Sequence, residues 1–280
     1  MTDQNLNRRE FLKIAGLGAM ATVGAKVVAA AGSAIRPILS RLPHPGDTGG
    51  SAHRWVMVID LARCDGCGAC TTACSAMHMV PPGQAWIKVY KMEHETFAGS
   101  YYFPRPCMQC DNPPCVNVCP VGASYKRSDG IVLIDQEICI GCRFCLAACP
   151  YSARYFNWAE PPHTAAELSQ PYSVETNTPH RRGVAEKCLF CPALTSQGEL
   201  PACTSACPMG AIYFGDENEA AVTNGLGETL PLEKLLADGA ALRHLEELGT
   251  EPRVWYLPPR TLPSETNADQ GTAQIPAQQG

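Results

Sequence analysis

The sequence lacks an excess of positive charge and lacks long uninterrupted hydrophobic runs. Its 22 Lys and Arg are outnumbered by 27 Asp and Glu, so the net charge of −5 excludes an electrostatic nucleic-acid binder. It has no run of about 18 apolar residues, which excludes a multi-span membrane protein. Hydrophobic residues still make up 45% of the 280 residues, which excludes disorder and predicts one or two compact domains plus tails.

The sequence also lacks the motifs of substrate chemistry. It has no Walker motif, no Gly-x-Gly-x-x-Gly after a predicted strand, no Cys-x-x-Cys-His haem site and no Ser/His/Asp pattern. The seven histidines, which include His78 and His94, form no spaced ligand set and are expected to be solvent-facing or satisfied locally. These absences predict a chain that is not an enzyme by itself.

The N-terminus has the order of a bacterial twin-arginine export signal. Arg8 and Arg9 precede Phe-Leu-Lys at 11–13, and an apolar Gly/Ala-rich stretch follows over 14–31, interrupted once by a lysine. Its length suits a signal better than a spanning helix. We therefore predict a signal over 1–41 and a periplasmic protein that acquires its cofactor before export. An ordinary amphipathic helix and an uncleaved anchor are the alternatives.

The cysteines are the unusual feature, because all 16 fall into four groups of four. The first and third groups are spaced C-x2-C-x2-C-x3-C, the second C-x2-C-x4-C-x3-C and the fourth C-x2-C-x11-C-x3-C. A proline follows the last cysteine of every group except the first. In chain order the groups are Cys64, Cys67, Cys70 and Cys74; Cys107, Cys110, Cys115 and Cys119; Cys139, Cys142, Cys145 and Cys149; and Cys188, Cys191, Cys203 and Cys207.

These spacings are typical of bacterial ferredoxins. A C-x2-C-x2-C loop lets three thiolates converge on one cubane, and Gly66, Gly68 and Gly141 let the backbone wrap closely around it. In two-cluster ferredoxins the fourth cysteine of each group ligates the other cluster. The sequence therefore predicts [4Fe–4S] clusters.

Three other roles for the cysteines account less well for their number and spacing. Eight disulfides suit an exported protein, but they do not account for repeated cubane spacing. Structural zinc sites usually show two separated C-x2-C pairs, without a third cysteine at the same spacing. Sixteen free core thiols would be an oxidation hazard outside the cytoplasm. Iron–sulfur ligation is therefore the favoured interpretation.

Short β-branched runs flank the cysteine groups and predict strands at 56–60, 131–135 and 211–214. Each group then belongs to a strand, cluster loop, helical turn and strand, and two such units make one two-cluster ferredoxin fold. Segments 40–52 and 262–280 are rich in Pro, Gly, Ser, Thr and Gln and are predicted to be linker and tail.

Leucines at helical spacing over 231–249 predict one amphipathic helix that packs on its own domain. The polar segment 161–182, with several prolines and histidines, is predicted to be a loop that a partner could cover. Trp86 and Trp158 are predicted to pack in the core, with packing on a partner as the alternative. Four basic residues either raise cluster potentials or are solvated surface charges, and the sequence does not distinguish the two: Arg63, Lys126, Arg143 and Lys187.

Over roughly residues 54–220 the chain resembles the four-cluster iron–sulfur electron-transfer subunits of complex iron–sulfur molybdoenzymes, the dimethyl sulfoxide reductase family. It also resembles the iron–sulfur subunit of the sulfite-reductase-associated membrane complex. These motifs are specific for the superfamily and not for one complex. The matching stretches are Ile59-Asp60-Leu61-Ala62-Arg63-Cys64, Cys110-Asp111-Asn112-Pro113-Pro114-Cys115, Asp129-Gly130-Ile131-Val132 and Cys139-Ile140-Gly141-Cys142-Arg143-Phe144-Cys145.

The resemblance implies that the first cysteine group pairs with the fourth, and the second with the third. It further implies four [4Fe–4S] clusters, because every ligand position holds cysteine. The implied ligands are Cys64, Cys67, Cys70 and Cys207 for cluster 1; Cys74, Cys188, Cys191 and Cys203 for cluster 2; Cys107, Cys110, Cys115 and Cys149 for cluster 3; and Cys119, Cys139, Cys142 and Cys145 for cluster 4.

The same resemblance implies an α+β fold of two interleaved ferredoxin-like lobes related by pseudo-symmetry. One lobe would combine 53–98 with 183–225, and the other would be 99–160. An insert loop at 161–182 and a C-terminal helix and tail at 226–280 complete the expected organisation.

The resemblance implies a relay of single electrons between a membrane quinone-reacting (NrfD-like) subunit and a periplasmic catalytic subunit, a molybdopterin oxidoreductase. Residues 259–280 are polar, so the protein would be peripheral on the outer face of the cytoplasmic membrane and attached through its partner. Three alternatives remain open. They are a component of a molybdenum-free respiratory complex of the sulfite-reductase-associated type, a free exported polyferredoxin, and a structural metal-binding protein.

Overall fold

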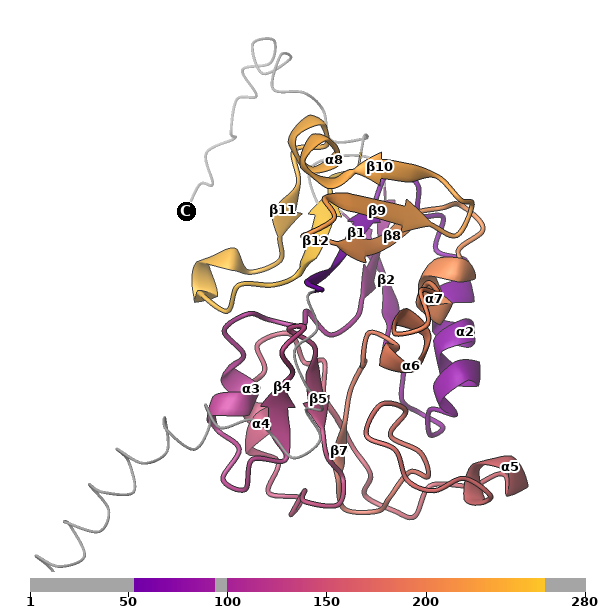
Figure 1. Ribbon diagram of the computed structural model, residues 1–280, viewed down its shortest axis with the longest axis vertical. Helices are drawn as coiled ribbons and strands as arrows, with labels where there is room; N and C mark the ends of the chain where they lie inside the picture. The colour runs from indigo at the N-terminus through magenta and orange to yellow at the C-terminus, as the bar shows by residue number, and fades with distance from the viewer. Residues whose placement is uncertain (1–52, 94–99, 260–280) are drawn as a thin grey trace, which may run out of the picture. The chain divides into compact units, whose positions relative to one another are not determined.

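A six-stranded sheet organises the residues that the computed structural model describes, 53–93 and 100–259 (Figure 1). The strand order is β10-β9-β8-β1-β12-β11, and the central strand β1 pairs antiparallel with β8 and parallel with β12. The predicted export signal, with Arg8 and Arg9, lies outside the described residues. The strands are β1 (Trp55–Asp60), β8 (Ile212–Asp216), β9 (Ala221–Asn224), β10 (Thr229–Pro231), β11 (Leu242–Arg243) and β12 (Val254–Leu257).

Strand β1 is buried on both faces, which explains why its sequence is a continuous run of hydrophobic residues. Because side chains alternate along a strand, Met57 and Ile59 enter one core and Val56 and Val58 enter another. The first core also contains several cysteines, whereas the second is closed by helix α8 (Leu232–Asp238). The sheet therefore carries the cysteine-rich part of the molecule on one face only.

The helices are short, and most begin within or beside a cysteine group. Helix α2 packs against α7, and α3 packs against α4. Three two-stranded ribbons complete the described fold. These elements are α2 (Ala69–His78), α3 (Pro114–Asn117), α4 (Phe144–Ala148), α5 (Ala165–Leu168), α6 (Pro192–Thr195), α7 (Ala202–Ser205) and the 3-10 turn η1 (Glu246–Leu248), with ribbons β2 (Lys88–Glu93)/β3 (Ser100–Arg105), β4 (Ser124–Lys126)/β5 (Val132–Ile134) and β6 (Tyr155–Phe156)/β7 (Ala185–Glu186).

The three strands expected beside the cysteines are confirmed as β1, β5 and β8. The single helix expected over 231–249 is wrong, because α8 ends at Asp238. Ala240 and Leu245 have left-handed backbone angles (φ 47° and 54°), which an α-helix does not accommodate. The chain instead forms β11 on β12. The leucines of α8 itself do pack on the sheet, as expected.

The segment 161–182 has little regular structure beyond α5 and an isolated bridge between Ser173 and Thr178. Part of it nevertheless packs inward, because Glu167 and His180 are almost fully buried. The two tryptophans also differ: Trp86 is buried as predicted, whereas Trp158 is 68% exposed and the prediction of a core position for it is wrong.

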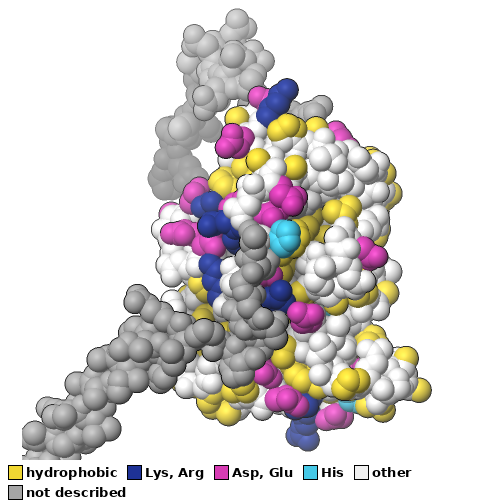
Figure 2. Space-filling model, in the orientation of Figure 1, with side chains coloured by type: hydrophobic (Ala, Val, Ile, Leu, Met, Phe, Trp, Pro, Cys, Tyr) yellow, Lys and Arg dark blue, Asp and Glu magenta, His cyan; other side chains and the backbone are white. Residues whose placement is uncertain are grey.

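The surface carries charges of both signs. On the face that Figure 2 shows, basic and acidic side chains lie next to one another instead of forming a patch of one sign. Ion pairs such as Arg54 with Asp111, at 2.7 Å, account for part of this pattern. In the ranges that the structure describes, no helix combines the length and apolar character needed to cross a membrane.

Candidate metal centres

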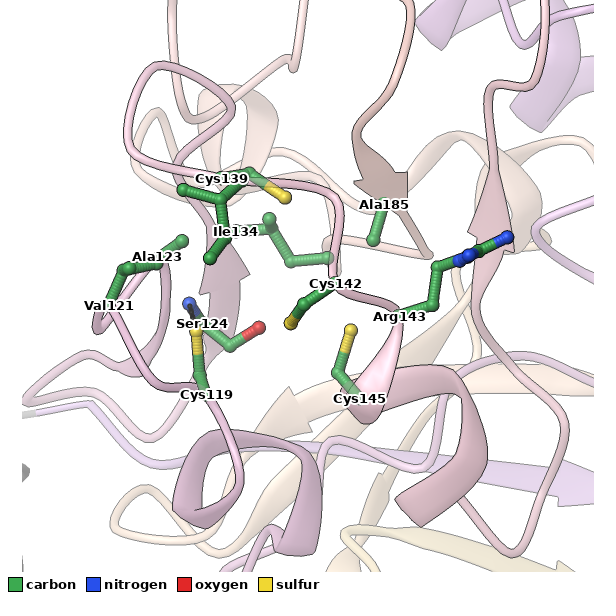
Figure 3. Close-up of a pocket in the computed structure, with 11 residues that line it drawn as sticks. Cys119, Val121, Ala123, Ser124, Ile134, Cys139, Cys142, Arg143, Cys145 and Ala185 are labelled. Atoms are coloured by element: carbon green, nitrogen blue, oxygen red, sulfur yellow. Dashed lines mark hydrogen bonds between the residues drawn. The ribbon is translucent and has the colours of Figure 1, made fainter. Parts of the chain in front are cut away.

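Four cysteines from two separate groups line one pocket (Figure 3). Cys139, Cys142 and Cys145 come from the loop and first turn that form α4. The fourth, Cys119, follows α3 and belongs to the preceding group. The four side chains surround a common space, and Arg143 at its edge is directed away from it. We call this set of four cysteines the fourth site.

A second pocket is lined by the other four cysteines of these two groups. It is lined by Cys107, Cys110 and Cys115, together with Cys149 from the end of α4. Packing of α3 against α4 brings the last cysteine of each group beside the other group. We call this set the third site.

The remaining eight cysteines lie around α2, α6 and α7. Burial raises the pKa of the Cys70 thiol to about 11, and the nearby sulfurs of Cys64 and Cys207 raise it further. These three cysteines, with the exposed Cys67, form the first site.

The second site is formed by Cys74, Cys188, Cys191 and Cys203. Burial raises the pKa of Cys203 well above its ordinary value, and the sulfurs of the other three members add to the rise. The packing of α2 against α7 places Cys74 beside this group, although 114 positions separate it from Cys188 in the sequence. Tertiary contacts therefore gather four thiols at each of the four sites.

In the fourth and the second cysteine groups, a backbone amide shortly after the last cysteine donates to its sulfur. The amide of Ala211 donates to Cys207 Sγ at 3.3 Å, and the amide of Ser124 donates to Cys119 Sγ at 3.5 Å. Gly141 has φ +68°, and a Cβ added there would lie 2.3 Å from the carbonyl oxygen of Gly183. Only glycine allows the cysteine loop to pass this close to the neighbouring segment.

All sixteen cysteines are free thiols. A metal cluster that carries net negative charge once four thiolates bind it also accounts for Arg154, which is 6% exposed. Arg154 Nη1 donates to Ser124 Oγ at 2.9 Å, while its buried Nε and Nη2 have no oxygen acceptor and its other polar neighbours are the sulfurs of Cys115 and Cys145. Four converging sulfurs beside a buried, incompletely paired cation fit an iron–sulfur cluster.

The four basic residues singled out in the sequence have different environments. Lys187 is fully buried, so a solvated charge is wrong for it; its Nζ donates to the carbonyls of Val132 and Cys188. The others are more exposed: Arg63 pairs with Glu228 at 2.6 Å, Lys126 pairs with Asp111 at 2.7 Å, and Arg143 lies over the rings of Phe156 and Trp158.

Sequence reasoning missed Arg154 and set aside His78. Arg154 lies five residues after Cys149, so inspection of positions adjacent to cysteines does not find it. His78 is 1% exposed, and its Nε2 lies 3.2 Å from Cys191 Sγ. Burial lowers the pKa of His78 to about 4, and its Nε2 is placed to donate to the Cys191 sulfur when that sulfur is a thiolate.

Comparison with known proteins agrees with this geometry. Residues 98–169 match one 4Fe-4S dicluster domain family, and residues 63–123 and 138–211 match a second family of the same description. These matches span all sixteen cysteines and support 4Fe–4S clusters as the cofactor.

Three relatives are informative. The B subunit of selenate reductase from Mesobacillus selenatarsenatis is 44% identical over 220 residues, with 73% of this chain and 72% of the relative covered. The B component of polysulfide reductase from Wolinella succinogenes is 34% identical, with 74% and 95% covered. Hdr-like menaquinol oxidoreductase iron–sulfur subunit 1 of Archaeoglobus fulgidus is 32% identical, with 90% and 97% covered. The protein therefore belongs to the family of iron–sulfur electron-transfer subunits of reductase complexes, which includes the B subunits of the molybdoenzymes.

Proposed function

We propose that the sixteen cysteines hold four [4Fe–4S] clusters, one at each of the four sites, in a protein with no catalytic role of its own. When bound, such clusters supply one-electron transfer. The protein's part is to supply four thiolates per site, exclude water from most of them, and place the sites near one another.

The observation that carries this proposal is the proximity of cysteines of successive sites, since members of the first three sites share one buried core cluster. Burial raises the pKa of Cys188 to about 12, and the sulfur of Cys107, from the third site, contributes to the rise. Cys70 of the first site acts in the same way on Cys203 of the second. Cys115 of the third site and Cys145 of the fourth lie on the packed helices α3 and α4. The sites therefore follow one another from first to fourth.

This arrangement supports the two-lobe organisation. The first and second sites share α2 and α7, from segments 53–98 and 183–225, and the third and fourth share α3 and α4 from 99–160. We propose that these are interleaved ferredoxin-like lobes related by pseudo-symmetry. The proximity of Cys107 to Cys188 would be the crossing between them.

A row of sites is useful only between two other redox centres. We propose that one end meets a quinone-reacting membrane subunit and the other a periplasmic molybdopterin-containing catalytic subunit. The reductase complexes that contain the selenate and polysulfide relatives support this placement. The paired arginines at positions 8 and 9 support export, with the protein peripheral on the outer face of the membrane.

A molybdenum-free respiratory complex is the second candidate. The specific observation in its favour is that the Hdr-like menaquinol oxidoreductase subunit matches 90% of this chain, more than the 73% matched by the selenate reductase subunit. Its lower identity, 32% against 44%, favours the first candidate.

The deciding experiment is anaerobic purification of the native protein from membranes in mild detergent, with iron, sulfide and molybdenum analysis. About four irons per site and co-purification of a large molybdenum protein with a multi-span subunit are expected. Haem and further iron–sulfur subunits without molybdenum would favour the second candidate. Zinc in place of iron, or recovery of the cluster-loaded protein alone in the soluble fraction, would refute the proposal.

The ligand assignment has its own test, because the last cysteine of each group is assigned to another group's site. Cys119→Ser and Cys142→Ser are expected to alter the same cluster signal in electron paramagnetic resonance, whereas Cys110→Ser alters a different one. Matching spectra for Cys119→Ser and Cys110→Ser would show that each group keeps its own last cysteine and would refute the assignment.

A further inference from the structure

Arg154 lies where the third and fourth sites meet. Its side chain lines the pocket that contains Cys107 and Cys115 of the third site. Its Nη1 also donates to Ser124 Oγ at 2.9 Å, and Ser124 lines the pocket of the fourth site. One guanidinium group is therefore adjacent to two candidate metal centres.

The charge of Arg154 has no carboxylate partner among the described residues. The charge of another buried arginine, Arg253, is balanced by a carboxylate, because its Nε lies 3.1 Å from an oxygen of Asp111. Arg154 instead donates to the neutral hydroxyl of Ser124, and its other polar neighbours are the sulfurs of Cys115 and Cys145. Since an isolated buried charge is very unfavourable, the fold must supply negative charge from another source.

Nearby sulfurs can supply that negative charge. Arg154 lines the same pocket as Cys107, Cys110, Cys115 and Cys149, and a cluster held by four thiolates carries net negative charge. A guanidinium stays protonated in proteins, so its charge is permanent. The first site lacks an equivalent, because the nearby Arg63 is partly exposed and is neutralised by Glu228.

We propose that Arg154 is the shared counter-charge of the third and fourth cluster sites and raises the reduction potential of both. Adding an electron next to a fixed buried cation is favoured, and charge near a cluster is one of the factors that set its potential. The inference rests on the proposed ligation of clusters at these two sites.

The size of the effect follows from Coulomb's law. At an effective dielectric constant of about 20, a unit charge within about 10 Å changes an equilibrium constant for charge addition by roughly tenfold or more. For a one-electron couple, a tenfold change corresponds to about 59 mV. Removal of the Arg154 charge is therefore expected to lower two of the four midpoint potentials by at least that amount.

The test compares Arg154→Gln, which removes the charge, with Arg154→Lys, which keeps it. Arg181→Gln is the matched control, because Arg181 is exposed and already paired with Glu137 at 2.8 Å. Each variant is loaded and purified anaerobically, its iron and sulfide are measured, and its midpoint potentials are determined by redox titration followed by electron paramagnetic resonance.

We expect every variant to contain the full complement of iron. Two midpoint potentials should fall in Arg154→Gln and should fall by less than half as much in Arg154→Lys. No midpoint potential should change in Arg181→Gln. Four unchanged potentials in fully loaded Arg154→Gln would overturn the proposal. Equal shifts in the Gln and Lys variants, or loss of iron in both, would also overturn it, because each would reveal a structural role. If the wild type itself holds no [4Fe–4S] clusters, the ligation has failed instead.

Discussion

Gly141→Ala tests whether the close approach of the cysteine loop to the neighbouring segment is required for a complete fourth site. Gly141 lies between Cys139 and Cys142, and an added Cβ would be 2.3 Å from the Gly183 carbonyl oxygen. That carbonyl cannot yield easily, because the Gly183 amide is held by Asn157 O at 2.7 Å. The methyl group would therefore displace the cysteine loop and its ligands.

The magnitude is the sum of two effects. A left-handed conformation costs a non-glycine residue about 1–2 kcal/mol. Overpacking adds about 1–3 kcal/mol, so the total for Gly141→Ala is about 2–5 kcal/mol. Gly68→Ala is the matched control, because Gly68 also lies in a cysteine loop, has φ +74° and has nothing within 4 Å of its added Cβ. Only the first effect applies there.

The assay is iron and acid-labile sulfide per protein after anaerobic purification. We expect about 12 irons in Gly141→Ala and about 16 in both Gly68→Ala and the wild type. A non-glycine residue is expected to be tolerated at position 68, because Arg143 occupies the corresponding position of the third cysteine loop with φ 62°. Full iron in Gly141→Ala, with thermal stability equal to that of Gly68→Ala, would refute the steric reasoning.

Two further predictions concern histidines. His78→Phe removes the Nε2 donor that lies 3.2 Å from Cys191 Sγ. We expect redox titration to show one midpoint potential lowered by roughly a few tens of millivolts. An unchanged potential would show that this contact does not tune the cluster. Hydrogen bonds to Glu160 and Glu167 raise the pKa of His163 in the folded protein. The protonated ring therefore stabilises the fold fully below the unfolded pKa of about 6.5, and this stabilisation is lost as pH rises through the folded pKa. His163→Gln should therefore lower the midpoint of anaerobic thermal unfolding at pH 6 and change it little at pH 9, and an equal loss at both would contradict this.

The sequence was most informative where the chemistry is local. Cysteines two or three residues apart determine which thiols can converge on one group, so spacing alone predicted iron–sulfur sites. The short β-branched runs likewise predicted β1, β5 and β8. Helical leucine spacing failed after Asp238, because left-handed residues and pairing of β11 with β12 override the local pattern there.

Other features depend on residues far apart in the sequence. The fit of Cys74 beside Cys188 and the parallel pairing of β1 with β12 require contacts that no local pattern encodes. The burial of Lys187 and Arg154 is of the same kind, since the sequence shows a positive charge but not its surroundings. By itself, therefore, the sequence determined where the cysteines lie that are predicted to ligate iron. Only the tertiary structure decided how the sites follow one another and which buried cations lie between them, because burial and electrostatic proximity arise from the packing of distant segments.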